Sequence, residues 1–279
     1  MTSSPRLLLT IDYESWFAPS RRYDFLPPEK RFALDEGFAR DALDPILERL
    51  GESKVSFYLV GELVEWYPDL PRKIRDAGHE VGFHCQVHRP LTTLADIEHD
   101  LQTSVHWRAE NHVVGFRAPM IRTIEEVYPL LARHGFTYSS SLYAPTGTLL
   151  QKGGLWELPV STYPFFRHPS RLTAPRNMTL PLLLGGEFPY SSSLMSGLFQ
   201  PLVYKLIEKE FRAGRSPVIF LHPYEIIPPT RWPQRFFRDI LANPLLTPFT
   251  FSKADFLKNL LRDFPTATLD SYLRETRPQ

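Results

Sequence analysis

Residues 6–14 read RLLLTIDYE, an apolar run that ends at two carboxylates separated by one tyrosine. The run from Leu7 to Ile11 predicts a buried β-strand, because short continuous apolar segments are typical of strands in a parallel sheet. Successive side chains of an extended chain point to opposite faces, so Asp12 and Glu14 share one face and Tyr13 points to the other. The segment therefore predicts a strand that brings two carboxylates to one place.

The same unit, a short apolar run followed by a segment of helical periodicity, recurs along the chain. Further strands are predicted at residues 55–60, 80–83, 113–116, 136–142, 155–160 and 218–221, and helices at 41–50, 67–77, 96–109, 124–134, 204–213 and 252–262. This alternation predicts parallel strands joined by right-handed crossovers, an α/β fold. About seven such strands fit a barrel better than an open sheet. We expect one domain over residues 1–279, with an irregular, proline-containing segment, 161–200, over one mouth of the barrel.

Composition excludes several classes of protein. The 279 residues contain 32 Lys and Arg against 31 Asp and Glu, a net charge of +1, so neither a nucleic-acid partner nor an anionic membrane is expected. One cysteine allows no disulfide within the chain and fits a reducing compartment. The longest apolar runs are far shorter than a membrane-spanning helix, and residues 1–5 lack the features of a signal peptide. We expect a cytoplasmic protein without an integral membrane segment.

Ionisable residues follow four of the predicted strands at the points where the strands end. Parallel α/β folds bring the carboxyl ends of their strands to one face, where ligand sites form. One carboxylate and two imidazoles are a common metal-ligand set in hydrolases. A structural alternative exists for each residue taken singly, such as a turn cap or an ion pair, but their joint placement favours a site. The six residues are Asp12, Glu14, His84, His88, Arg117 and His222.

In the motifs that contain these residues, the chain resembles the polysaccharide deacetylases of the NodB-homology type, in the carbohydrate esterase 4 superfamily. The resemblance extends over residues 6–260 and includes the strand SFYLVG at residues 56–61. Five motifs occur in the family order: TIDYE (10–14), HCQVH (84–88), RAPM (117–120), LWELP (155–159) and LHP (221–223). It implies a distorted (β/α) barrel, NodB-like, and metal-assisted hydrolysis of an N-acetyl or N-formyl group on a sugar or glycan.

The resemblance also implies the roles of individual residues. Asp12 is expected to be the general base and His222 the general acid, with Arg117 orienting the base. The backbone N–H of Met120 is expected to face the oxyanion. Trp16, which follows the first motif closely, is expected to line the substrate cleft, with packing in the core as the alternative.

The metal ligands implied are His84, His88 and a carboxylate. The usual first motif has two adjacent aspartates, whereas Tyr13 stands in the second position here. Tyrosine is a poor ligand for such a cation, so we assign Glu14, on the face of Asp12, as the third ligand. The set suits Zn²⁺, and Co²⁺, Ni²⁺ or Fe²⁺ would also be accepted.

Two further departures and two alternatives remain open at this point. Met120 replaces a common aromatic residue, and Glu157 stands in the fourth motif instead of an aspartate, which leaves the partner of His222 undefined. The tyrosine at position 13 motivates one alternative, a cofactor-independent amidohydrolase similar to the allantoinase branch of the family. The other alternative is a carbohydrate-binding relative without turnover.

Overall fold

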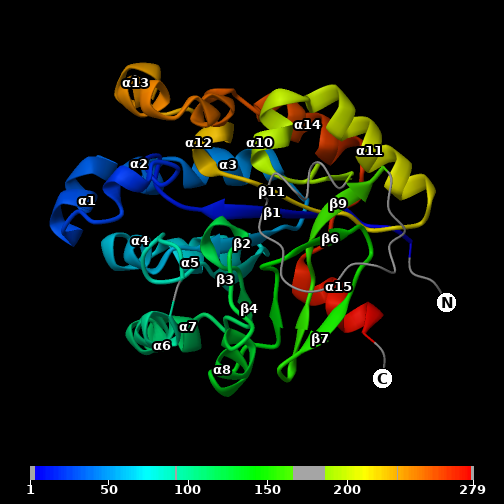
Figure 1. Ribbon diagram of the computed structural model, residues 1–279, viewed down its shortest axis with the longest axis horizontal. Helices are drawn as coiled ribbons and strands as arrows, with labels where there is room; N and C mark the ends of the chain where they lie inside the picture. Colours follow the sequence, from blue (N-terminus) through cyan, green and yellow to red (C-terminus); the bar gives the residue numbers. More distant parts are fainter. Residues whose placement is uncertain (1–3, 92, 166–185, 231, 278–279) are drawn as a thin grey trace.

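The computed structural model describes residues 4–91, 93–165, 186–230 and 232–277. Its largest sheet has eight strands in the order β11-β1-β2-β3-β4-β5-β8-β7 (Figure 1). Neighbours in this sheet are parallel except for β7 and β8, so seven strands run in one direction, which confirms the predicted α/β class. The strands are β1 (Leu8–Tyr13), β2 (Ser56–Leu59), β3 (Glu80–Phe83), β4 (Gly115–Phe116), β5 (Tyr138–Ser139), β7 (Leu150–Lys152), β8 (Leu155–Glu157) and β11 (Val218–Leu221).

A smaller sheet brings the two sides of the large sheet together. It contains β6 (Tyr143–Pro145), β9 (Val160–Pro164) and β10 (Glu187–Phe188). The β9 strand continues directly from β8 and meets β11 at the far side of the large sheet, where Val218 N donates to Ser161 Oγ at 2.8 Å. A second bond, from Phe220 N to Ser191 O at 3.3 Å, lies beside it. The contact is made by side chains and loops instead of a continuous ladder, so the barrel is distorted, as expected.

Helices surround this curled sheet (Figure 1). Their apolar faces pack on strands that are buried on both sides, as the runs of apolar residues predicted. The helices are α1 (Pro28–Asp35), α2 (Phe38–Asp41), α3 (Leu43–Leu50), α4 (Gly61–Trp66), α5 (Leu70–Asp76), α6 (Leu94–Thr103), α7 (Val105–Glu110), α8 (Val127–Arg133), α10 (Ser193–Leu198), α11 (Gln200–Arg212), α12 (Pro223–Ile226), α13 (Trp232–Ala242), α14 (Ala254–Asp263) and α15 (Leu269–Thr276), with 3₁₀ turns η1 (Arg21–Tyr23), η2 (Pro119–Ile121) and η4 (Pro244–Thr250).

Two predicted segments differ from the structure. The helix expected over 96–109 breaks into α6 and α7 at Ser104, whose hydroxyl donates to the carbonyl of Asp100 at 2.7 Å and so competes with the helical pattern. Segment 161–200 was expected to have no clear helix, yet it forms α10, whose first turn is capped by Ser192 Oγ accepting from Met195 N at 3.3 Å. Residues 166–185 of that segment lie outside the described residues.

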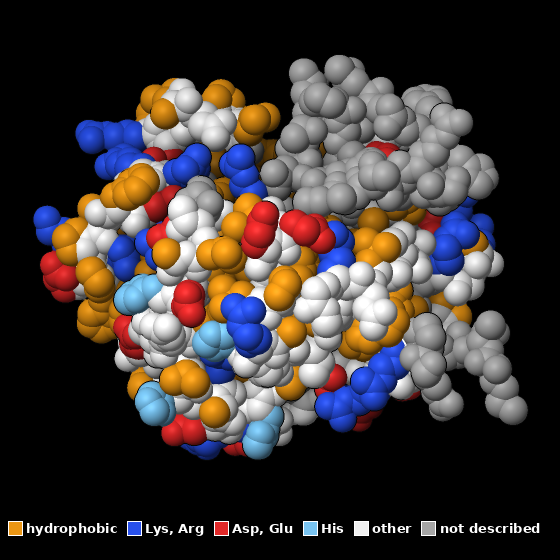
Figure 2. All heavy atoms as spheres, turned by 60° about the horizontal axis from the view of Figure 1, so that its bottom comes forward, with side chains coloured by type: hydrophobic (Ala, Val, Ile, Leu, Met, Phe, Trp, Pro, Cys, Tyr) orange, Lys and Arg blue, Asp and Glu red, His pale blue; other side chains and the backbone are white. Residues whose placement is uncertain are grey.

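The surface carries charges of both signs. On the face drawn in Figure 2, acidic and basic side chains are interspersed with hydrophobic ones and no field of one sign dominates. Among the described helices, none combines the length and the apolar character that a membrane span requires.

Candidate active site

The six predicted residues meet at the carboxyl edge of the parallel sheet. Asp12 and Glu14 lie at the end of β1. Directly after β3, β4 and β11 come His84, Arg117 and His222, and His88 lies in the loop that follows β3. Five of the six line one cleft of about 340 Å³: Asp12, Glu14, His84, His88 and His222. The sixth, Arg117, is completely buried behind the wall. The convergence that the sequence predicted is therefore present in the structure.

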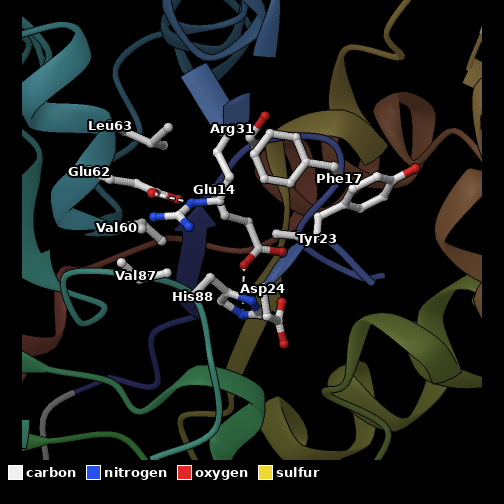
Figure 3. Close-up of a pocket in the computed structure, with 12 residues that line it drawn as sticks. Glu14, Phe17, Tyr23, Asp24, Arg31, Val60, Glu62, Leu63, Val87 and His88 are labelled. Carbon is white, nitrogen blue, oxygen red and sulfur yellow. Dashed lines mark hydrogen bonds and ion pairs between the residues drawn. The ribbon is translucent and has the colours of Figure 1, made fainter. Parts of the chain in front are cut away.

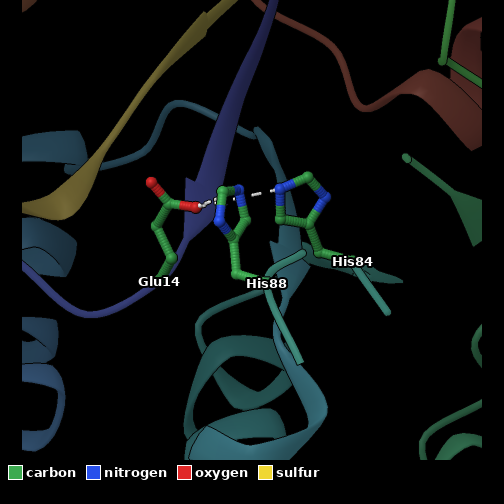
Figure 4. Close-up of side chains that lie close together, drawn as sticks. All are labelled: Glu14, His84 and His88. Carbon is green, nitrogen blue, oxygen red and sulfur yellow. Dashed lines mark ion pairs between the residues drawn. The ribbon is translucent and has the colours of Figure 1, made fainter. Parts of the chain in front are cut away.

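The Glu14 carboxylate and the two imidazoles that follow β3 form a candidate metal centre (Figure 4). Glu14 Oε2 lies 2.9 Å from His88 Nε2 and 3.9 Å from His84 Nε2. One potential ligand atom from each residue lies within 4.8 Å of the other two. Glu14 Oε2 is buried and accepts no well-aligned hydrogen bond from the described residues, so its lone pairs face the imidazole nitrogens. An orphaned buried carboxylate oxygen beside two imidazoles fits a divalent cation.

Neighbouring groups orient these candidate ligands. His84 Nδ1 lies 2.8 Å from the carbonyl oxygen of Arg117, which can only accept, so this nitrogen carries the proton and Nε2 presents a lone pair. Burial lowers the pKa of His84 to about 4 and keeps the ring neutral near pH 7. On the other side, Tyr224 donates to Glu14 Oε1 at 2.7 Å. Glu14 thus directs one oxygen to the tyrosine and the other to the imidazoles.

Electrostatics at Glu14 and His88 favour an ionised carboxylate. Burial alone would raise the pKa of Glu14, but the facing imidazoles of His88 and His222 outweigh it and hold the pKa at about 2. Burial alone would lower the pKa of His88, but Glu14 outweighs burial and raises it. Beside this pair lies a small space that is also lined by the buried Arg31–Glu62 ion pair (2.7 Å) (Figure 3). Little room remains there, so a ligand reaches Glu14 from the cleft side.

The two histidines do not lie on a helix, although a spacing of four residues would place both on one face of a helical turn. They belong to a loop in which Cys85 has a left-handed φ of 65°. The loop is held from outside the segment, because Gly61 N donates to Cys85 O at 2.8 Å and Glu62 N to Gln86 O at 2.9 Å. A β-carbon on Gly61 would lie 2.2 Å from Gln86 Oε1, so glycine permits this close approach. The Cys85 thiol itself is buried, and burial raises its pKa, which suits an inert packing residue.

Asp12 is held by Arg117. Arg117 Nη1 donates to Asp12 Oδ1 at 2.8 Å, while its Nε and Nη2 donate to the carbonyl and the hydroxyl of Ser140 at 3.0 and 2.7 Å. The guanidinium also lies 4.3 Å from the centre of the Tyr58 ring. All three guanidinium nitrogens of Arg117 donate hydrogen bonds, so the guanidinium is fixed. It therefore fixes the orientation of Asp12 through Oδ1.

His222 lies on the opposite side of Glu14 from His88. Its Nε2 is 3.6 Å from Glu14 Oε1, and its Nδ1 is 3.1 Å from Glu225 Oε2. The Tyr224 ring stacks on the imidazole at 5.0 Å with an interplanar angle of 10°. Burial would lower the pKa of His222, but Glu225 and Glu14 outweigh it and raise it.

Part of the chain matches known proteins. The family model described as polysaccharide deacetylase matches residues 34–139, which contain His84, His88 and Arg117. A peptidoglycan deacetylase-like protein of Gibberella zeae is 34% identical over 103 residues, 35% of this chain. This match covers only 30% of that relative's length.

Residues 34–139 thus resemble the polysaccharide deacetylase family. Enzymes of this family are hydrolases that act on carbon–nitrogen bonds. Two solved structures share the fold. A crystal structure described as a polysaccharide deacetylase from Mycobacterium smegmatis is 20% identical with a TM-score of 0.54, covering 100% of this chain and 99% of the other. An allantoinase, Puue, is 16% identical with a TM-score of 0.55, covering 95% and 93%. At these identities the two structures support the fold alone.

Against the polysaccharide deacetylase pattern, the departure at Tyr13 is resolved by strand geometry. Tyr13 is completely buried on the face opposite the cleft, and its hydroxyl donates to Ala39 O at 2.6 Å. Glu14 occupies the cleft side, as the alternation of the strand predicted. Tyr13 is therefore a packing residue.

Met120 and Trp16, the two residues expected to contact substrate, have different surroundings. Met120 lines the cleft with 42% of its surface exposed and has a φ of 56°, a strained conformation often found at active sites. Trp16 does not line the cleft. Its ring is buried among Phe17, Tyr23 and Phe236, and its Nε1 donates to Leu34 O at 3.1 Å. The expected contact of Trp16 with substrate is wrong, and packing is its role, because Trp16 turns toward η1 and α13.

The partner of His222 is Glu225, which sequence reasoning missed. Glu157, in the fourth family motif, lies elsewhere: its Oε1 accepts from Ser141 N and Leu142 N at 2.7 and 2.9 Å. The sequence did contain one signal for Glu225, which follows His222 by three residues, the spacing of a capping box at a helix start. Tyr224, which contacts both Glu14 and His222, carried no such signal.

Proposed function

We propose that this protein is a divalent-metal-dependent hydrolase that removes an N-acetyl or N-formyl group from a sugar. The observation that carries the proposal is that Asp12, His222 and the cluster of Glu14, His84 and His88 line one cleft. A base, a candidate metal centre and an acid in one cleft are the groups that metal-assisted hydrolysis of an amide uses.

Glu14, His84 and His88 would hold the cation. Their donor set, one carboxylate and two imidazoles, suits Zn²⁺ and would also accept Co²⁺, Ni²⁺ or Fe²⁺. When bound, a divalent cation there would make water easier to deprotonate and would polarise the acyl carbonyl.

Asp12 is the proposed general base. Arg117 engages its Oδ1, and Oδ2 has no hydrogen bond to any of the residues that the structure describes. Oδ2 is therefore the oxygen that takes a proton from the attacking water. The backbone N–H of Met120, at the cleft wall, is the proposed donor to the oxyanion that forms on the acyl carbon.

His222 is the proposed general acid. When the carbon–nitrogen bond breaks, its electron pair remains on nitrogen, and the amine leaves only if it gains a proton. His222 supplies that proton, and the products are acetate or formate and the free amino sugar. Its Nδ1 faces Glu225, so Nε2 is the nitrogen that faces the cleft.

A polysaccharide or a lipid-linked glycan precursor is the substrate class we favour. The cleft has room for more than the acyl group, and its outer wall includes the apolar residues Leu194, Leu245 and Phe249. Such surfaces pack against the hydrophobic faces of sugar rings. The expected cytoplasmic location is part of this proposal.

A panel of N-acetylated sugars tests the proposal. The panel contains glycan oligomers and nucleotide- and lipid-linked N-acetyl sugars, each assayed for released acetate with Zn²⁺ and with a chelator. We expect release that stops on chelation and returns with added metal. Release that continues undiminished in chelator would favour the cofactor-independent alternative, and complete inertness with metal present would favour the non-catalytic one.

A further inference from the structure

A buried polar cluster lies behind His222, away from the cleft. It consists of Ser193 on α10, Glu225 on α12 and Lys253 just before α14, three segments that lie together beside β11 in Figure 1. All three side chains are completely buried. Burying two charges is costly unless both are paired and hydrogen-bonded, so the cluster calls for an explanation.

Within the cluster, Glu225 contacts His222 twice. Its Oε2 accepts from His222 N at 2.9 Å and lies 3.1 Å from His222 Nδ1. A carboxylate can only accept here, so Nδ1 carries a proton toward Glu225. The first contact caps the short helix α12, but a cap needs no contact with the ring. The second contact fixes the imidazole, which Tyr224 supports from one face.

Lys253 and Ser193 hold Glu225 in turn. Lys253 Nζ donates to Glu225 Oε1 at 2.5 Å, to Ser193 O at 2.6 Å and to Ser193 Oγ at 2.5 Å, which uses all three of its protons. Ser193 Oγ also donates to Glu225 Oε1. A backbone hydrogen bond also joins these two residues, because Lys253 N donates to Glu225 O at 2.6 Å. One oxygen of Glu225 is thus anchored and the other is left to His222.

We infer that Glu225, anchored by Lys253 and Ser193, is the positioning residue that holds His222 with Nε2 toward the cleft, an inference that rests on the proposed function. In the step where the carbon–nitrogen bond breaks, the departing nitrogen takes its proton from Nε2. The Nδ1 proton stays on the ring, directed at Glu225, and the imidazole becomes neutral. Glu225 takes the place that the aspartate of the fourth family motif would have.

Two variants that differ only in the acceptor test this role. Both carry Lys253→Met, so no unpaired charge stays buried; one has Glu225→Gln, which keeps an oxygen acceptor, and the other Glu225→Met, which removes it. Replacing a buried ion pair by residues of similar volume is often tolerated. Each variant is assayed on an N-acetyl sugar and on 4-nitrophenyl acetate, whose leaving group needs no proton.

For the Met variant we expect the ratio of amide to ester turnover to fall by at least ~10-fold through kcat, because general-acid catalysis is worth 10²- to 10⁴-fold. The Gln variant should retain most of the wild-type ratio. Glu157→Gln, at an equally buried glutamate without contact to His222, should leave the ratio unchanged. Equal loss on both substrates in the Met variant, or a selective loss in Glu157→Gln, would overturn the inference.

A second readout does not depend on turnover. Recorded at a pH at which the ring is neutral, nitrogen-15 shifts of His222 should show a proton on Nδ1 in the wild type and in the Gln variant, and a mixture of tautomers in the Met variant. Unchanged ring shifts in the Met variant would overturn the inference. Failure of the wild type to hydrolyse any amide would instead count against the proposed function, and the ring shifts would still decide the role of Glu225.

Discussion

At the scale of single residues, the site depends on which face of β1 a side chain occupies. The alternation of an extended strand was enough to predict that Asp12 and Glu14 share the cleft and that Tyr13 is turned away. The rule worked because β1 is an interior strand, hydrogen-bonded to β11 on one side and to β2 on the other, in a regular register. Tyr13, although it stands in a family motif, is therefore a packing residue.

Asp12→Asn tests the proposed base. Asparagine keeps an oxygen that can accept from Arg117 but cannot take a proton from water, so we expect kcat to fall on the order of 10²- to 10⁴-fold. Sugar binding, measured by calorimetry, should persist. Asp41→Asn, an exposed carboxylate on α2, is the matched control and should leave kcat unchanged. Activity of Asp12→Asn within a few fold of wild type would exclude Asp12 as the base.

The residues that position His222, the proposed general acid, were less predictable from the sequence than the face of β1 that each side chain occupies. Glu225 lies three residues from His222, within the reach of local rules. Lys253 is 28 residues further along the chain and meets Glu225 only because α12 and α14 pack together. No pattern in the sequence distinguishes this lysine from exposed ones, so its burial is a property of the fold.

At the scale of elements, strand positions were predicted better than the ends and interruptions of helices. The strand at 80–83 was predicted at its observed bounds. The loop from His84 to His88 was not, because its conformation depends on contacts with α4, outside the segment. The residues of the site were thus identified, but the shape that brings them together was not.

Packing inside the sheet depends on glycines opposite large side chains. Gly115 on β4 is in register with Tyr138 on β5, and a β-carbon at Gly115 would lie 2.2 Å from the Tyr138 hydroxyl oxygen. That hydroxyl donates to Glu80 Oε1 at 2.5 Å and accepts from Tyr58, so it has little freedom to move.

We expect Gly115→Ala to lower the free energy of unfolding by about 1–3 kcal/mol, as overpacking does. Urea denaturation measures the loss. In a Tyr138→Leu background the same substitution should cost less, because the atoms that it meets are gone. An identical cost in the two backgrounds would show that the close approach to Tyr138 is not its cause.

At the scale of the whole molecule, the alternating strands and helices were enough to predict the class and the seven parallel strands. The way in which the sheet curls was not predictable from them. Its sides meet through β9, in a segment expected to be irregular, by a hydrogen bond to the side chain of Ser161. Such a junction has no periodicity that a sequence pattern could show.

Stability should depend on pH through His79. This histidine is buried between strands, Val55 N donates to its Nδ1 at 3.4 Å, and burial, with a smaller effect of Lys54, lowers its pKa to about 4. The unfolded chain, with a histidine pKa near 6.5, binds a proton as the pH falls while the folded chain does not. The contribution is therefore complete above pH 6.5 and is lost progressively toward pH 4.

Between pH 7 and pH 5 the loss from His79 should be about 2 kcal/mol. Unfolding in urea at both pH values measures it, and His79→Gln, which cannot be protonated, should reduce the loss by that amount. Glu14 and Glu225, with pKa values of about 2, contribute only below this range. An equal loss in His79→Gln and wild type would assign the pH dependence to other groups.

The metal centre is the claim on which the rest depends, and an anomalous difference map tests it most directly. Crystals grown with Zn²⁺ should show one strong peak at the zinc edge, about 2.0–2.2 Å from Glu14 Oε2, His84 Nε2 and His88 Nε2. Glu14→Gln crystals grown in the same way should show a weaker peak or none. A wild-type map without a peak at this position, from protein that hydrolyses its substrate in the presence of a chelator, would contradict the account.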